Sequence, residues 1–394
     1  MDQHGFLLSG AAWKRGHAVI LTLAVISWAA CALGYATAPQ QFYASYLAGY
    51  MYFLTIALGA AFFVMLQHLT GAVWSVTVRR LMETVMATLP VAALLFVPIA
   101  AGLPTLYEWA RPEFYSSDPD LRFKMLFFSP AFFFARAAVY FAVWCALAIS
   151  LYRRSVAQDG SGDIDAIRKS VFWSAPGLVL LFVTVTMAAV DWLMSLEPHW
   201  YSTIFGIYIF AGGALAFIGA LILVSVAFRR GGVLEDSITV DHYHDLGKWL
   251  FVLVVFWAYI AFSQYLLIWY ANLPEETFWF RHRLEGTWTW VSASLLLGNF
   301  ILPFLLLIAS GAKRNLRLLG SVSALILLMH FVNLHWVIMP TVHQHGFHLH
   351  WLDAAAMAGV GSAYGLVFWR LLRRHALIPV GDLRLSRSLR HQTE

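Results

Sequence analysis

The chain has 394 residues and a formal net charge of +5 at pH 7. Hydrophobic residues make up 60% of it and charged residues only 12%, about half the share of charged residues in soluble domains. Such a chain cannot cover a water-facing surface. The composition therefore excludes a soluble protein and predicts an all-α integral membrane protein with a single transmembrane domain, 1–394.

Uncharged, apolar runs of about 20 residues predict membrane-spanning helices, whereas the strands of a membrane barrel would be shorter and would alternate. The segments 103–126 and 229–247 between such runs are too short to form a separate domain. The sequence predicts ten spans, in chain order 17–36, 43–69, 81–102, 127–152, 171–194, 203–228, 248–271, 287–309, 316–339 and 351–372.

The basic residues predict the orientation of these spans. Most of the 26 Lys and Arg residues fall on one side of the predicted membrane, which the positive-inside rule identifies as the cytoplasmic side. Both termini are therefore predicted to be cytoplasmic, and the net charge does not indicate a nucleic-acid partner. The exceptions are Arg136, inside a span, and five residues on the opposite side, Arg111, Arg122, Lys124, Arg281 and Arg283.

A short internal sequence repeat indicates how the spans are grouped. The second span opens with SYLAGYMYF and the sixth with STIFGIYIF, and both contain Ser-x-x-x-Gly. Four helices separate the two copies, which suggests two four-helix bundles with a flanking helix at each end. Small residues at this spacing also serve simply to pack helices. The predicted divisions are 17–36 (flanking helix), 43–194 (first bundle), 203–339 (second bundle), 351–372 (flanking helix) and 373–394 (cytoplasmic tail).

The segment between the fifth and sixth spans carries Asp191, Glu197 and His199. Asp191 lies about 31 Å along the helix from the cytoplasmic end of its span, which places it at the outer rim of the bilayer. A carboxylate that directly follows an apolar run is costly and indicates a cationic partner or a functional role. Proton or quinol chemistry could use such a group. The alternative is an interfacial turn anchored by aromatic side chains.

Other polar residues inside the spans fall into two groups, one per leaflet. Arg136 requires a partner, for which Asp191 and Asp353 are the candidates. The two groups are typical of a proton path, in which Asp, Glu and His exchange protons through water, although polar side chains also join helices by hydrogen bonds. The predicted outer cluster is Asp191, Arg136, His330, His335, Gln264 and Asp353, and the predicted inner cluster is His68, Glu83 and Lys248.

No redox cofactor is expected on this chain. Its two cysteines, Cys31 and Cys145, form no CxxC or CxxCH motif, so neither c-type haem nor an iron–sulfur cluster is expected. His330 and His335 are five residues apart, about 140° around a helix, and do not form one haem-ligand face. No metal site and no catalytic residue is predicted. The histidine-rich segment TVHQHGFHLHW, with His343, His345, His348 and His350, is expected to contact an extramembrane partner.

Four motifs resemble the polysulfide-reductase-like (NrfD-like) integral membrane subunits, and most closely the smaller such subunit of bacterial alternative complex III. The similarity extends over nearly the whole chain. The motifs are QHLTGAVWSVTVRRLMETV (67–85), DWLMSLEPHWYSTIFGIY, SQYLLIWYANLPEETFWF and IPVGDLRLSRSL.

The resemblance implies two four-helix bundles with flanking helices in the bacterial cytoplasmic membrane. It implies partners, namely a larger homologous membrane subunit, a periplasmic iron–sulfur subunit, c-type cytochrome subunits and a terminal oxidase. The complex oxidises menaquinol or ubiquinol, and the iron–sulfur clusters and haem c belong to the partner subunits. The resemblance also implies a quinol near the outer face of the first bundle, which makes Asp191, Glu197 and His199 the candidates for a position near it. This chain would anchor those subunits and conduct protons, without being an enzyme alone. The alternatives are a quinol-binding catalytic subunit, a ten-helix secondary transporter and a passive scaffold.

Overall fold

Ten helical segments are long and apolar enough to cross a membrane in the computed structural model, which describes residues 10–111, 113–114, 124–344 and 346–392. These segments match the ten predicted spans. Within the described ranges the chain contains helices, turns and bends but no β-strand, so the predicted all-α membrane fold is confirmed.

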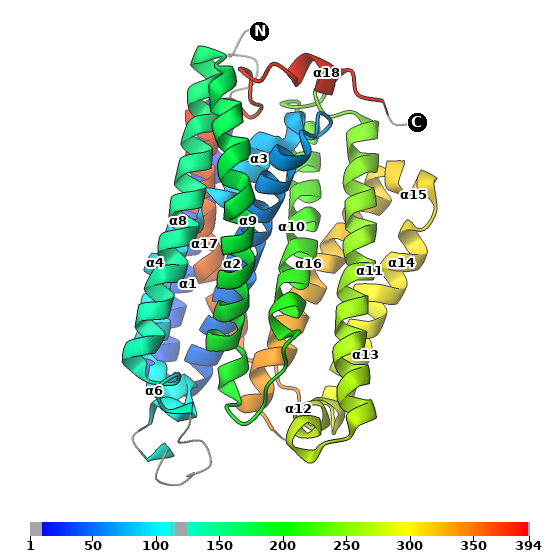
Figure 1. The fold of residues 1–394 in the computed structure, drawn as a ribbon. Helices are drawn as coiled ribbons and strands as arrows, with labels where there is room; N and C mark the ends of the chain where they lie inside the picture. Colours follow the sequence, from blue (N-terminus) through cyan, green and yellow to red (C-terminus); the bar gives the residue numbers. More distant parts are fainter. Residues whose placement is uncertain (1–9, 112, 115–123, 345, 393–394) are drawn as a thin grey trace.

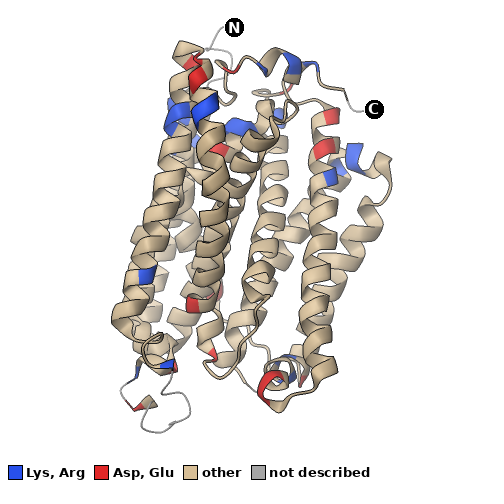
Figure 2. Ribbon diagram, in the orientation of Figure 1, with Lys and Arg blue, Asp and Glu red and all other residues tan. Residues whose placement is uncertain are grey.

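The helices run side by side, with α1 beginning and α17 ending at the end of the molecule drawn at the top of Figure 1, where α18 also lies. Lys and Arg gather at this end, and charged residues are sparse in the central part of the bundle (Figure 2). The long helices are α1 (Gly10–Thr37), α2 (Pro39–Thr70), α8 (Pro130–Ser161), α9 (Ile164–Trp192), α10 (Phe205–Arg230), α11 (Val240–Ala271), α16 (Leu316–Ile338) and α17 (Trp351–Arg374).

Prolines divide the third predicted span into short helices, a feature that the hydropathy did not predict. Each of the three short helices that follow Met86 has Pro at its first or second position, where the missing N–H is not needed. The result is a chain of helical pieces, still long enough to span. They are α3 (Val76–Met86), α4 (Leu89–Leu95), α5 (Val97–Ala101) and α6 (Leu103–Leu106), followed by η2 (Glu108–Ala110).

The eighth span also departs from a regular helix. It consists of α13 (Trp288–Leu295), the π-helix η5 (Leu296–Ile301) and α14 (Leu302–Leu307). Pro303 follows the π-helix and has no N–H for the carbonyl of Asn299. We attribute the wider turn to this proline, because widening removes the clash between its ring and that carbonyl.

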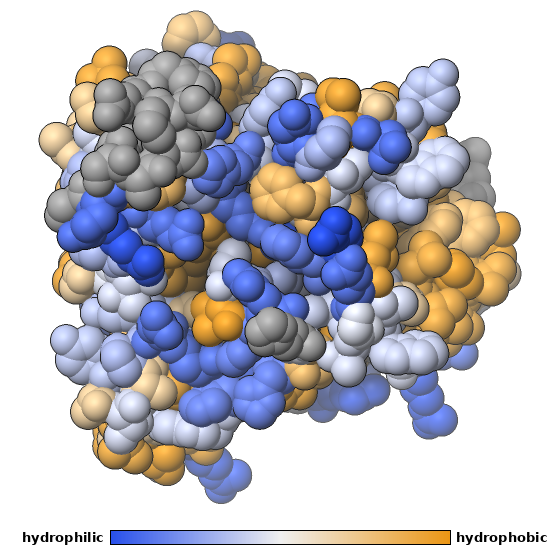
Figure 3. All heavy atoms as spheres, turned by 90° about the horizontal axis from the view of Figure 1, so that it is seen from below, coloured by the Kyte–Doolittle hydropathy of each residue, from blue (hydrophilic) through white to orange (hydrophobic). Residues whose placement is uncertain are grey.

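The short elements lie at the two ends of the bundle. At the end opposite the termini are η4 (Met194–Leu196), η6 (Met339–Thr341) and α12 (Pro274–Leu284), a short helix between the seventh and eighth predicted spans. Seen from this end, hydrophilic side chains spread across the face, while hydrophobic ones lie mostly along its edges, with a large group at the right (Figure 3). At the other end are α15 (Ser310–Arg314) and α18 (Leu385–Leu389).

Helices α2 and α10 form the centre of the molecule and are the two most buried spans. Helix α2 packs against α3, α9, α10 and α17, and α10 packs against α9, α11 and α16. The two central helices approach closely through glycine: a Cβ atom on Gly213 would lie 2.7 Å from the carbonyl oxygen of Thr55. Small residues at such crossings permit backbone contact between membrane helices.

Replacing Gly213 by Ala is expected to destabilise the protein by about 1–3 kcal/mol, because the added methyl group forces two packed backbones apart. The measurement is reversible unfolding in mixed micelles. Gly160→Ala on α8 is the control, since nothing lies within 4 Å of a Cβ atom there, and it should change the stability by less than about 1 kcal/mol. Equal effects of the two substitutions would contradict the close approach.

Candidate functional site

Asp191 and Arg136 form a buried ion pair in the half of the bundle farther from α18, which is the half predicted to be outer and is called outer below. The guanidinium donates from Nε to Oδ2 and from Nη2 to Oδ1, both at 2.8 Å. Tyr140 donates to the same Oδ2 at 2.7 Å, and Arg136 also donates to the carbonyl of Phe127 at 3.0 Å. Asp191 is only 1% exposed. Of the two carboxylates proposed as partners for Arg136, the structure therefore selects Asp191.

Asp353 belongs to a separate series of hydrogen-bonded side chains. Its Oδ1 accepts from Ser45 Oγ at 2.5 Å and from Gln41 Nε2 at 3.4 Å, and its Oδ2 accepts from the backbone N–H of His350 at 2.9 Å. Gln41 in turn lies 2.6 Å from His343, measured from Oε1 to Nε2. The donors to this carboxylate are neutral groups, in contrast to the guanidinium that holds Asp191.

Gln41 and Ser45 belong to this series of hydrogen-bonded side chains but are not among the predicted site residues. A signal was present, because the two polar residues are four apart on α2 and so share a face. Their partner could not be named, since Asp353 is more than three hundred residues away in the sequence.

Glu197 and His199 do not join Asp191, although all three are close in sequence. Glu197 pairs with the fully buried Arg283 of α12, at 3.0 Å between Oε2 and Nη2, and lies 3.6 Å from Nδ1 of His282. His199 instead packs near Phe114, with 6.5 Å between ring centres. The outer turn therefore has two arginine–carboxylate sites on different helices.

Arg283 was counted only as a topology determinant, yet it joins three segments. It donates to the carbonyls of Trp279, Trp336 and Val337 at 2.8–3.1 Å. Its guanidinium also stacks on Trp279, 3.7 Å from the ring centre. Burial lowers the pKa of Arg283, and the charge of Glu197 opposes that shift.

A third polar group lies deeper, where α2, α10 and α16 meet. His330 Nε2 is 2.9 Å from the hydroxyl of Thr55, and the hydroxyl of Tyr208 donates to Asn333 Oδ1. His335 lies elsewhere, among Phe331, Trp288 and Phe347. The two span-nine histidines thus face different neighbours. Gln264, also predicted for the outer cluster, accepts from Ser202 Oγ at 3.2 Å.

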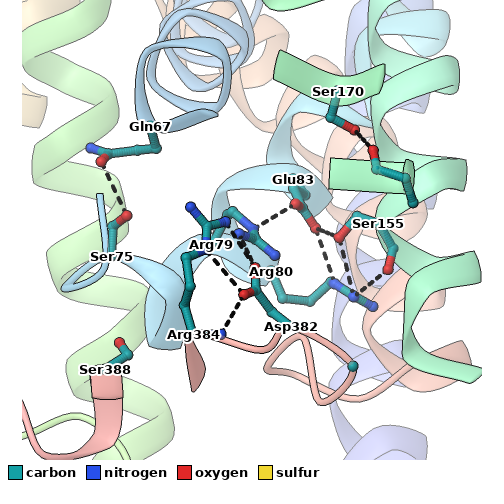
Figure 4. A network of polar contacts seen from close by, with 12 residues as sticks. Gln67, Ser75, Arg79, Arg80, Glu83, Ser155, Ser170, Asp382, Arg384 and Ser388 are labelled. Atoms are coloured by element: carbon teal, nitrogen blue, oxygen red, sulfur yellow. Dashed lines mark hydrogen bonds and ion pairs between the residues drawn. The ribbon is translucent and has the colours of Figure 1, made fainter. Parts of the chain in front are cut away.

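At the end where α18 lies, a buried network of ion pairs surrounds Glu83 (Figure 4). The carboxylate pairs with both Arg79 and Arg80 at 3.1 Å and accepts from Ser155 Oγ at 2.6 Å. Arg80 also pairs with Asp159 at 2.9 Å. Glu83, Arg79 and Arg80 are at most 2% exposed, so this network replaces the water that each charge loses.

The C-terminal tail completes the network. Asp382 lies 2.6 Å from Nη1 of Arg79 and 2.9 Å from Nη2 of Arg384. Further along, Ser388 donates to the carbonyl of Trp74 at 3.0 Å. The segment predicted as a cytoplasmic tail is therefore folded back on α3, and its side chains Leu377 and Ile378 are fully buried.

The three residues predicted for the inner cluster occupy different environments. Glu83 lies in the arginine network, while Lys248 pairs with Asp245 at 2.5 Å on α11 and is half exposed. His68, at the end of α2, is buried. Neither of its ring nitrogens has a hydrogen-bond partner within the described part of the chain.

Asp382 is expected to make stability depend on pH. Burial alone would raise its pKa, but the hydrogen bonds from Arg384 and the charge of Arg79 hold the pKa below its ordinary value of 3.8. The stabilisation is therefore fully present above about pH 4 and is lost as the pH falls below that value. Asp382→Asn should flatten the fall in unfolding free energy measured between about pH 4 and pH 2, and an unchanged slope would contradict it.

An apolar layer separates the deep polar group from the inner one. Between Thr55 and Gln67, about 18 Å along α2, the residues are apolar or glycine. Phe62 and Phe63 in this stretch pack edge-on against Phe210 and Trp249. At this level of α2 the deep and inner polar groups are thus separated by packed aromatic rings.

Comparison with known proteins adds no identification to this geometry. Within the described ranges, no three His, Cys, Asp or Glu side chains converge in a way that could hold a metal ion. No protein-family model matches the chain, and no curated protein sequence matches it.

Proposed function

We propose that this chain is a membrane subunit of a quinol:electron-acceptor oxidoreductase of the alternative complex III type, located in the bacterial cytoplasmic membrane. Its work is to anchor the periplasmic iron–sulfur and haem c subunits beside a larger homologous membrane subunit. Quinol oxidation belongs to that neighbour, and the electrons pass through the partners to a terminal oxidase.

The observation that carries this proposal is the pairing of the four motifs on which the resemblance depends. At the outer end, Trp200 of one motif stacks on Trp279 of another, with 4.4 Å between ring centres. At the inner end, Asp382 of the tail motif pairs with Arg79 of the motif 67–85. Motifs far apart in sequence thus form two contact sites, one at each end of the bundle.

The same proposal includes the arrangement of the spans. Helices α2, α8 and α9 with the pieces α3–α5 would form one four-helix bundle, and α10, α11, α13–α14 and α16 the other. The contacts between α8 and α9, and between α10 and both α11 and α16, support this grouping. The concentration of basic residues at the end with both termini supports a cytoplasmic location for that end.

For the proposed proton role, Asp353 is a better candidate than Asp191. Asp191 is held by a guanidinium and a phenol, which keep its charge compensated. Asp353 has neutral hydrogen-bond donors and connects through Gln41 to His343 near the outer surface. The quinol-proximal assignment of Asp191, Glu197 and His199 is also less favoured, since two of them are in arginine pairs.

The experiment that tests the complex is isolation of the chain from native membranes in mild detergent, with a visible spectrum and mass spectrometry of its companions. We expect haem c absorption, a large iron–sulfur protein and a second, longer membrane homologue. A colourless protein without companions would overturn the proposal and would favour solute transport instead.

The proton role has its own test. Asp353→Asn should keep the shape of the side chain and the hydrogen bond from Ser45, while it loses the acceptor for the His350 N–H and removes the titrating group. It should lower the proton-to-electron ratio of the complex in vesicles. Asp165→Asn, at an exposed position of α9, is the control. Unchanged turnover and an unchanged ratio in Asp353→Asn would show that Asp353 carries no protons.

A further inference from the structure

We propose that the second half of the chain binds one outer-leaflet phospholipid, with an acyl chain in a side cavity and the phosphate beside α12. The cavity has a volume of about 410 Å³ and lies between α10, α11, α12, α13, η5 and α16. Its size is within the range of ligand sites in proteins, which are mostly apolar with a few polar groups.

The walls of the cavity suit a hydrocarbon chain. Its lining is dominated by aromatic and aliphatic side chains, with Gln264 and Ser292 among the few polar ones. The aromatic lining residues are Tyr208, Trp257, Phe262, Tyr265, Phe280, Phe300 and Trp336.

The polar and apolar parts of the lining lie at different depths. Ser292 is about 6 Å and Gln264 about 10 Å from the outer ends of α13 and α11. Phe300 and Trp257 lie about 18–21 Å from the same ends. An occupant therefore has its polar group near the outer surface and its apolar chain toward the middle of the membrane, which is how an outer-leaflet lipid is oriented.

The cavity is open toward the hydrocarbon of the membrane. Two of its lining residues, Phe262 and Leu296, are also 59% and 54% exposed. Both belong to membrane-spanning segments, so a lipid chain can enter sideways between α11 and η5. The wide turn of η5 contributes part of the wall, and such π-helical turns are frequent at functional sites.

The charge of α12 identifies a phosphate-bearing head. Its last turn contains Arg281, His282 and Arg283, while Phe280 and Leu284 of the same turn line the cavity. Arg283 is already engaged with Glu197. Arg281 is largely exposed in a pair with Glu285, so its guanidinium can also contact a phosphate at the mouth.

The test uses the full chain in vesicles that contain a trace of phosphatidylglycerol with a diazirine in its acyl chain. After illumination, labelled residues are mapped by mass spectrometry. We expect labelling of 257–265 and 292–300 about tenfold above the lipid-facing residues Val179 and Val183 of α9, a preference of about 1.4 kcal/mol. Equal labelling of all these positions would overturn the proposal.

Two variants on α11 form a matched pair. Ala261→Trp fills the cavity and should reduce its labelling to the level of α9, while Val255→Trp, on the exposed face of the same helix, should leave it unchanged. Arg281→Ala should weaken the labelling by phosphatidylglycerol. Since the mapping in the unaltered chain is decisive alone, a variant that fails to fold does not affect the conclusion.

A second probe tests whether the hydrocarbon chain in the cavity belongs to a phospholipid or to a quinone. If a diazirine-bearing isoprenoid quinone labels the cavity and the phospholipid does not, the phospholipid assignment is wrong and the quinol-binding alternative is favoured. The inference does not depend on the proposed redox complex, because lipid labelling is measured on this chain without partners.

Discussion

Replacing Asp191 by Ala is expected to destabilise the protein by about 3–5 kcal/mol, the usual cost of leaving one partner of a buried ion pair uncompensated. Arg136 would keep its contact to the Phe127 carbonyl but lose both hydrogen bonds to the carboxylate. Tyr140 would lose its acceptor as well. The measurement is the free energy of unfolding in mixed micelles.

The matched control removes both charges. Arg136→Met with Asp191→Leu should recover most of the lost stability, because a buried ion pair can often be replaced by apolar side chains at little cost. If Asp191→Ala alone is as stable as the parent protein, other groups compensate the buried charge of Arg136, and the ion pair is not required for the fold. If the double variant is as unstable as the single one, packing rather than charge explains the loss.

Replacing Glu83 by Ala should have a comparable or larger effect, since it leaves two buried arginines with one fewer carboxylate. Arg79 would depend on Asp382, and Arg80 on Asp159. We expect a loss of at least about 3 kcal/mol and a weaker hold on the C-terminal tail. Faster tryptic cleavage after Arg384, Arg387 or Arg390, measured on the intact protein, reports the release of the tail.

Glu235→Ala provides the comparison, because Glu235 is exposed in the connection between α10 and α11. It should change the stability by less than about 0.5 kcal/mol and leave the cleavage rate unchanged. A Glu83→Ala protein with an unchanged cleavage rate would show that Asp382 and Ser388 hold the tail without the arginine network.

The ten spans could be predicted because the hydrocarbon core requires long apolar helices, whatever packs around them. Their ends shifted, most clearly where α8, α9 and α11 continue beyond the apolar runs into polar residues such as Arg153 and Asp245. Hydropathy cannot detect these extensions, since a helix outside the bilayer has no need of apolar side chains.

For the polar sites, the sequence could predict which residues take part and how deep in the membrane they lie, but not which partner each residue has. The cost of an intramembrane charge singled out Arg136 and Asp191, and depth reduced the partner of Arg136 to two carboxylates. The choice between them required the packing of α8 against α9. Glu197 and His199 were grouped with Asp191 because they are close in sequence, but the turn at Pro198 directs Glu197 to Arg283.

The sequence by itself determined that this protein lies in a lipid bilayer, how many spans it has and which polar residues inside them are costly. These features follow from the sequence because the free energy of transferring a side chain into lipid depends on that side chain's own chemistry. The tertiary structure alone decided the partners of those residues, the folded-back tail and the cavity beside η5. Contacts such as those of Asp353 with Ser45 and of Asp382 with Arg79 join segments about three hundred residues apart. Such pairings depend on which helices are neighbours, and that is set by the packing of the whole bundle.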